Sequence, residues 1–242
     1  MVKNYLVCAV RPIEDGWLHQ KQTDLYTFYK EMYDISVASF KKFVQEPFEA
    51  VLWTDPVKNN DEYTVANWQA IKELWHREPC NIFWAGADTL MTQPTSLFSD
   101  RFKEYRLFNY TDPKTYRGFV NYFNDDIQYY PHTMSKQTWE VGEHLWTVRE
   151  GHPDQFWGFD QLRHNEMFWG QGIPENDWFH PELAYQAMKV RTLMPEEVAD
   201  ANAWNNYDIR QAHILHFHAS RGSHQVIELM KFISQQLGIT YE

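Results

Sequence analysis

The chain has 242 residues, 43% of them hydrophobic and 23% charged, which is typical of a globular protein that buries its core without disulfide support. Its net charge is −11 and it has no run of Lys or Arg, so nucleic acid is disfavoured as a partner, although a local basic groove is not excluded. The two cysteines lie in apolar runs, and neither a signal segment nor a long apolar span is visible, which predicts a soluble cytoplasmic protein that does not enter a membrane.

The first half of the chain alternates between strand and helix patterns. A continuous apolar run predicts a strand buried on both faces over residues 5–10. The same reasoning and helical apolar spacing predict, in order, a helix over 25–44, a strand over 48–54, a helix over 65–76 and a strand over 82–90. This alternation indicates an α/β fold of Rossmann type, with a mostly parallel central sheet flanked by helices.

The second half has a less regular pattern. We expect strands over 105–109, 190–194 and 214–217, an extended region over 119–130 with a bend at 124–126, and helices over 135–148, 159–169 and 223–237. We interpret the whole chain, 1–242, as one domain. Residues 1–95 would form a nucleotide-binding half, and residues 96–242 an acceptor-side half that ends in a metal and diphosphate element.

Polar residues follow several of the predicted strands. Asp88 ends one apolar strand, and His216 and His218 share one face of another. Ligands of open α/β sheets gather beyond the carboxyl ends of the strands, and a carboxylate with an imidazole there suits a divalent cation that holds phosphates. The plainer alternatives are an Asp that caps a turn and a pair of histidines that are satisfied in the core.

Two further segments carry candidate chemistry. Arg221 and Gly222 precede the last predicted helix, where an Arg and a helix N-terminus favour a phosphate. Asp160 and Gln161 begin an amphipathic helix and are candidates for contact with a sugar, although an acid at a helix start is also favoured by the helix dipole alone.

Taken together, these segments resemble the nucleotide-sugar glycosyltransferases of the GT-A fold, and most closely the glycogenin and lipopolysaccharide-galactosyltransferase group. The resemblance consists of scattered motifs in matching order across most of the chain. The segment from Gly86 to Asp88 resembles the Asp-x-Asp signature of these enzymes, with Gly86 in place of the first aspartate. The motif at 123–127, the helix start at Asp160 and the segment 216–222 are similar to later motifs of the family, the last to its His-x-x-Gly-x-x-Lys element.

The resemblance implies a nucleotide-sugar donor such as a UDP-sugar, a divalent cofactor (Mn²⁺ or Mg²⁺) and a transfer reaction that retains configuration. Inversion, in which Asp125 or Asp160 would be the general base, is the alternative. It implies base, ribose and diphosphate contacts at Arg11, Thr54, Asp55, Gly86, Ala87, Asp88, Arg221 and Gly222. The metal ligands would be Asp88 and His216, with His218 as the alternative histidine. Asp125 and Asp160 would be the catalytic carboxylates, and Asn124 and Gln161 would face the sugar or acceptor.

The acceptor is not identified by the sequence, and both a saccharide and a modified nucleobase of phage DNA are compatible with it. Two other classes of function remain open. One is a metal-dependent nucleotidyltransferase, which normally has two acids at the metal and a Gly-rich basic loop after the first strand. The other is a non-catalytic nucleotide- or carbohydrate-binding module, which the replacement of the first aspartate by Gly86 keeps open.

Overall fold

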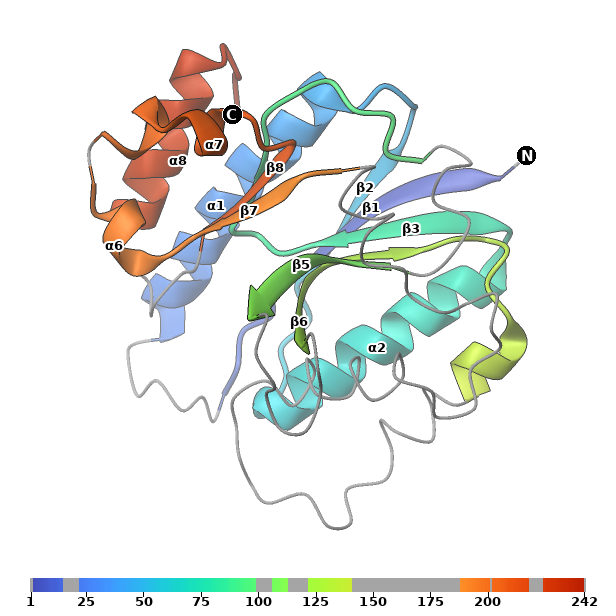
Figure 1. The fold of residues 1–242 in the computed structure, drawn as a ribbon. Helices are drawn as coiled ribbons and strands as arrows, with labels where there is room; N and C mark the ends of the chain where they lie inside the picture. The colour runs from blue at the N-terminus through green and yellow to red at the C-terminus, as the bar shows by residue number, and fades with distance from the viewer. Residues whose placement is uncertain are drawn as a thin grey trace.

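The structure, a computed structural model, describes residues 2–14, 22–98, 106–112, 122–140, 188–200, 202–217 and 224–241. Within the helices and strands, the side chains at 22–25, 60–61, 106–112 and 122–126 fall outside this description. Figure 1 shows the arrangement of the elements.

Within the described residues there are two sheets, and the larger has five strands in the order β2-β1-β3-β6-β5. Its members are β1 (Lys3–Ala9), β2 (Glu49–Trp53), β3 (Cys80–Ala85), β5 (Arg106–Asp112) and β6 (Tyr122–Tyr130). β1 pairs in parallel with β2 and β3, and β6 is antiparallel to both β3 and β5. All strands except β6 therefore run in the same direction, which confirms the predicted α/β class with a mostly parallel central sheet.

Two long helices cover opposite faces of this sheet. Alternate residues of β1 point to opposite faces, and Leu6 shares a core cluster with Phe40 of α1 (Gln22–Phe43). Tyr5 shares another cluster with Trp68 of α2 (Asn60–Arg77). Figure 1 shows the two helices on either side of the sheet. This placement follows from right-handed crossovers that run first from β1 to β2 and then back across β1 to β3.

In the part of the chain that the structure describes, the smaller sheet has three strands in the order β4-β8-β7, which are β4 (Thr89–Met91), β8 (Ile214–Phe217) and β7 (Val190–Leu193). β8 pairs antiparallel with β4 and parallel with β7. One of its faces packs against α1 and α8 (His224–Gln236), in a cluster that includes Met32, Leu215 and Ile233.

One predicted strand proved to be two. The apolar run over 82–90 is divided between β3 and β4, because a turn after Ala85 carries the chain from the larger sheet into the smaller one. The start predicted for α2 was also late, because the side chain of Asn59 accepts the backbone N–H of Glu62 and caps the helix several residues earlier. The predicted bend at 124–126 lies inside strand β6, next to a register irregularity in its pairing with β5.

The connection from β7 to β8 contains three short helices that the sequence pattern did not predict: α6 (Pro195–Val198), the 3₁₀ helix η3 (Ala203–Asn205) and α7 (Tyr207–Arg210). The predicted helix over 135–148 is described at 136–140, and the side chain of Ser135 accepts the N–H of Gln137 at 3.1 Å at its start. The predicted helix over 159–169 lies outside the described residues. Among the helices that are described, none has the length and hydrophobicity needed to cross a bilayer.

Candidate functional site

A tight turn places Asp88 between the two sheets. The backbone N–H and the side-chain hydroxyl of Thr89 both donate to the carbonyl of Gly86, at 3.2 and 2.7 Å. Asp88 lies within this turn with its side chain 16% exposed. The Asp88 carboxylate is therefore partly accessible to solvent, and its backbone is held in the turn by the two hydrogen bonds that Thr89 donates to Gly86.

His216 faces this carboxylate from the central strand of the smaller sheet. Its Nε2 lies 3.8 Å from Oδ2 of Asp88, and the backbone N–H of Phe217 donates to the Asp88 carbonyl at 2.8 Å. His216 is 2% exposed, and its Nδ1 lies 3.3 Å from Oγ1 of Thr192. The structure therefore brings together the acidic and the histidine-bearing strand ends, through the antiparallel register of β4 and β8.

Helix α1 holds β4 in place through two buried serines. Oγ of Ser36 lies 3.3 Å from Oγ1 of Thr89, and Oγ of Ser39 accepts the N–H of Met91 at 2.9 Å. Ser39 also donates to the carbonyl of Ser36 at 2.6 Å. The turn that carries Asp88 is thus fixed both by its own threonine and by the longest helix of the described chain.

Cys8 belongs to the apolar surroundings of this pair. Burial raises the pKa of the Cys8 thiol, and the charge of Asp88 raises it further, so the thiol is neutral at physiological pH. Cys8 shares a buried cluster with Ala87 and Leu215. Asp88 therefore lies close to a buried, uncharged group, and electrostatic interactions in buried surroundings are stronger than in water.

Arg11, at the end of β1, is held by partners within the protein. Its Nε donates to Oδ1 of Asn67 at 2.8 Å, and its Nη1 lies 3.3 Å from the carbonyl and 3.4 Å from Oδ2 of Asp55. The guanidinium also lies over the ring of Trp53, at 5.8 Å from its centroid, and the Arg11 side chain is only 6% exposed. Thr54 and Asp55 follow β2 and are exposed, so they present polar atoms beside a fixed cation.

The structure does not describe the side chains of several predicted site residues. Asn124 and Asp125 lie on β6, where the structure describes the backbone alone. The remaining five lie outside the described residues: Asp160, Gln161, His218, Arg221 and Gly222. Their predicted roles stay predictions.

Sequence reasoning missed four residues that support the site, namely Ser36, Ser39, Asn67 and Thr192. Serines in the middle of a helix are poor helix formers, so the two in α1 were the one local signal of a buried hydrogen-bonding role. Asn67 and Thr192 carried no such signal, since their partners are distant in sequence.

The separation of Asp88 and His216 suits a shared cation. Two ligands that each lie about 2.1 Å from one ion are about 3.0 Å apart at a right angle and about 4.2 Å apart across the ion. The observed 3.8 Å falls inside this interval. No group of three or more His, Cys, Asp or Glu side chains that could hold a metal occurs within the described part of the chain, so this pair alone is a partial ligand set.

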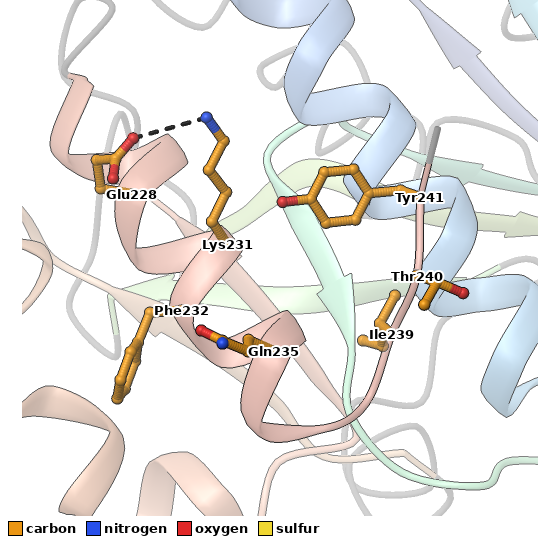
Figure 2. Close-up of a pocket in the computed structure, with 7 residues that line it drawn as sticks. All are labelled: Glu228, Lys231, Phe232, Gln235, Ile239, Thr240 and Tyr241. Atoms are coloured by element: carbon orange, nitrogen blue, oxygen red, sulfur yellow. Dashed lines mark ion pairs between the residues drawn. The ribbon is translucent and has the colours of Figure 1, made fainter.

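A surface hollow of 530 Å³ lies apart from these residues, between α8 and the C-terminal segment (Figure 2). Its lining includes Lys231, Phe232 and Tyr241, and Lys231 pairs with Glu31 of α1 at 2.6 Å. None of the predicted site residues lines it.

Comparison with known proteins identifies the fold. No family model matches the sequence, and no curated protein matches it either. Among solved structures, a glycosyltransferase involved in the glycosylation of the major capsid of PBCV-1 is similar, with a TM-score of 0.54 and 11% identity over 95% of this chain and 99% of that one. The apo form of the glycosyltransferase GlyE of Streptococcus pneumoniae TIGR4 is also similar, with a TM-score of 0.52 and 9% identity over 100% of this chain and 65% of that one. The chain therefore has a fold found in glycosyltransferases, as its motifs predicted.

Proposed function

We propose that this protein is a glycosyltransferase that moves a sugar from a nucleoside-diphosphate sugar to an acceptor hydroxyl, with a divalent cation at Asp88 and His216. The observation that carries the proposal is the 3.8 Å approach of these two side chains, at a turn between the two sheets of a fold found in glycosyltransferases. The reaction class rests on both parts of this observation, since a fold alone does not define a chemistry.

Asp88, His216 and Arg11 each have a distinct role in this proposal. Asp88 supplies a negatively charged oxygen and His216 a neutral nitrogen, and these donors suit Mn²⁺ or Mg²⁺ when diphosphate oxygens and water complete the coordination. A bound cation would supply positive charge against the departing diphosphate. Arg11, fixed by Asn67 and Asp55, would border the base and ribose.

The finer predictions belong to this proposal. We propose UDP as the nucleotide and Mn²⁺ as the first cation to test, with transfer that retains configuration. Asp125 and Asp160 would approach the sugar or the acceptor hydroxyl, with Asn124 and Gln161 beside them, and Arg221 and Gly222 would contact the diphosphate.

The direct test is a thermal-shift panel of nucleoside diphosphates and nucleotide-sugars, each with and without Mn²⁺. A ligand at a hundredfold excess over its dissociation constant stabilises the native state by about 2.7 kcal/mol. For a chain of this size that corresponds to about 5–11 °C in Tm. The Asp88→Asn and His216→Gln variants should lose the metal-dependent part of the shift. Asp208→Asn, which removes an exposed carboxylate on α7, should keep it.

Release or transfer of sugar from the stabilising donor then separates the enzyme from its alternatives. Sugar transfer supports the proposal. Stabilisation without turnover favours the binding module, and release of pyrophosphate from a nucleoside triphosphate favours the nucleotidyltransferase. If no nucleotide shifts Tm, the donor site at Asp88 and His216 is refuted.

A further inference from the structure

We propose that Thr192 is the positioning residue for His216: its hydroxyl accepts the hydrogen bond of Nδ1–H when a cation held with Asp88 takes the Nε2 lone pair. The inference deepens the proposed function, because it rests on Nε2 of His216 being a metal ligand there. It concerns a residue of β7 that neither the sequence motifs nor the fold comparison pointed to.

The backbone places the two side chains together. β7 and β8 pair in parallel, and Thr192 is the register partner of His216. Residues at matching positions on adjacent strands project from the same face of a sheet. Oγ1 of Thr192 and Nδ1 of His216 are accordingly 3.3 Å apart, a separation that the strand pairing sets.

The imidazole is oriented on its other side as well. His216 is 2% exposed, with Thr89 of β4 as its register partner across the antiparallel pairing. The hydroxyl of Thr89 donates to the Gly86 carbonyl at 2.7 Å, so its proton is committed to the turn. Of these two threonines, Thr192 is the one whose hydroxyl contacts the ring, and it contacts the nitrogen opposite Asp88.

If His216 is a metal ligand, the nitrogen that carries its proton determines whether the ring can bind the cation. An imidazole nitrogen binds a cation only through its lone pair, so the other nitrogen must carry the proton. Histidine ligands almost always donate that proton to an outer partner, and loss of the partner typically weakens metal binding 10- to 100-fold. A threonine hydroxyl can accept a hydrogen bond from this N–H, whereas the methyl group of valine cannot.

Three variants separate positioning from packing. Thr192→Val keeps the branched shape and strand propensity but removes the hydroxyl, and Thr192→Ser restores the hydroxyl in a smaller side chain. Thr92→Val is the matched control, since Thr92 is a buried threonine next to β4 whose hydroxyl donates to the Ala212 carbonyl at 2.6 Å instead of to a ring. All are studied as the full chain.

The first measurement is ¹⁵N NMR of the histidine rings at pH 8 with UDP and saturating Mg²⁺, a diamagnetic cation, with the His216 signals assigned by their loss in His216→Gln. We expect the Nδ1–H tautomer in the native protein, in Thr192→Ser and in Thr92→Val, and a shift towards Nε2–H in Thr192→Val. An Nε2–H tautomer in the native protein, or an unchanged tautomer in Thr192→Val, overturns the inference.

The second measurement is Mn²⁺ binding followed by electron paramagnetic resonance, with UDP present at a fixed concentration. We expect Thr192→Val to bind Mn²⁺ 10- to 100-fold more weakly than the native protein and Thr192→Ser to recover most of the affinity. Equal affinity in all variants overturns the positioning role. If the native protein binds no Mn²⁺, the metal part of the proposed function fails and the inference falls with it, whereas equal affinity in all variants leaves the proposed function standing.

Discussion

Replacement of Ser39 by alanine should destabilise the protein through one buried backbone group. Successive residues of β4 direct their N–H groups alternately towards β8 and away from it, and the N–H of Met91 points away to Oγ of Ser39 at 2.9 Å. Ser39 is fully buried, so Ser39→Ala leaves this N–H without a partner and without water. An unsatisfied buried donor costs about 1–3 kcal/mol.

Ser234→Ala provides the matched control. Ser234 is also a fully buried serine in a long helix, and its Oγ has no hydrogen-bond partner within the described structure. The gain in helix propensity is the same in both variants, so the difference between them reflects the bonds of the Ser39 hydroxyl to Met91 and Ser36, together with removal of the unpaired Ser234 hydroxyl. We expect Ser39→Ala to be less stable than Ser234→Ala by about 2 kcal/mol, or about 4–8 °C in Tm, in urea and thermal unfolding followed by circular dichroism. Stabilities within about 0.5 kcal/mol of each other would refute the reasoning, since that gap lies below the cost of an unsatisfied donor.

Further predictions concern groups outside this contact. Burial, reinforced by the charge of Lys189, lowers the pKa of His213. The stability contributed by the neutral imidazole is therefore complete above about pH 6.5 and is lost as the pH falls through the pKa of the folded state. The urea midpoints of unfolding at pH 8 and pH 5 should differ less in His213→Gln than in the native protein. Burial raises the pKa of Cys80 to about 11 and that of Cys8 further, so both thiols should react with Ellman's reagent only in denaturant, and fast reaction of the native protein would contradict their placement. Gly238 has φ +63°, so Gly238→Ala should lower the free energy of unfolding by about 1–2 kcal/mol, whereas an unchanged urea midpoint would argue against this backbone.

The parts of the fold that were predictable are those with strong local patterns. The apolar run in β1 and the helical periodicity of α1 each reflect a single element in uniform surroundings, so sequence and structure agree there. The division between β3 and β4 was not predictable in this way. The residues on both sides of Gly86 are apolar, and the change of sheet depends on a turn and on pairing with β8, far along the chain.

The candidate site, like the fold, was predictable only in part. Asp88 and His216 were found because each ends or occupies a short apolar strand, and their approach required only that the two strands meet. Thr192 and Ser39 could not be found, because a hydroxyl reveals its partner only once register and helix packing are known. Local composition therefore identified the residues proposed for the chemistry and missed those that orient them.

The antiparallel pairing of β4 with β8 also has a consequence for the order of folding. The two strands lie in the first and last parts of the chain, so their pairing closes a very long loop. A ribosome releases the N-terminal strands first, and they can assemble with α1 and α2 while β8 is still unmade. Asp88 then lies in an incomplete sheet, and the proposed donor site forms only once β8 is available to pair with β4.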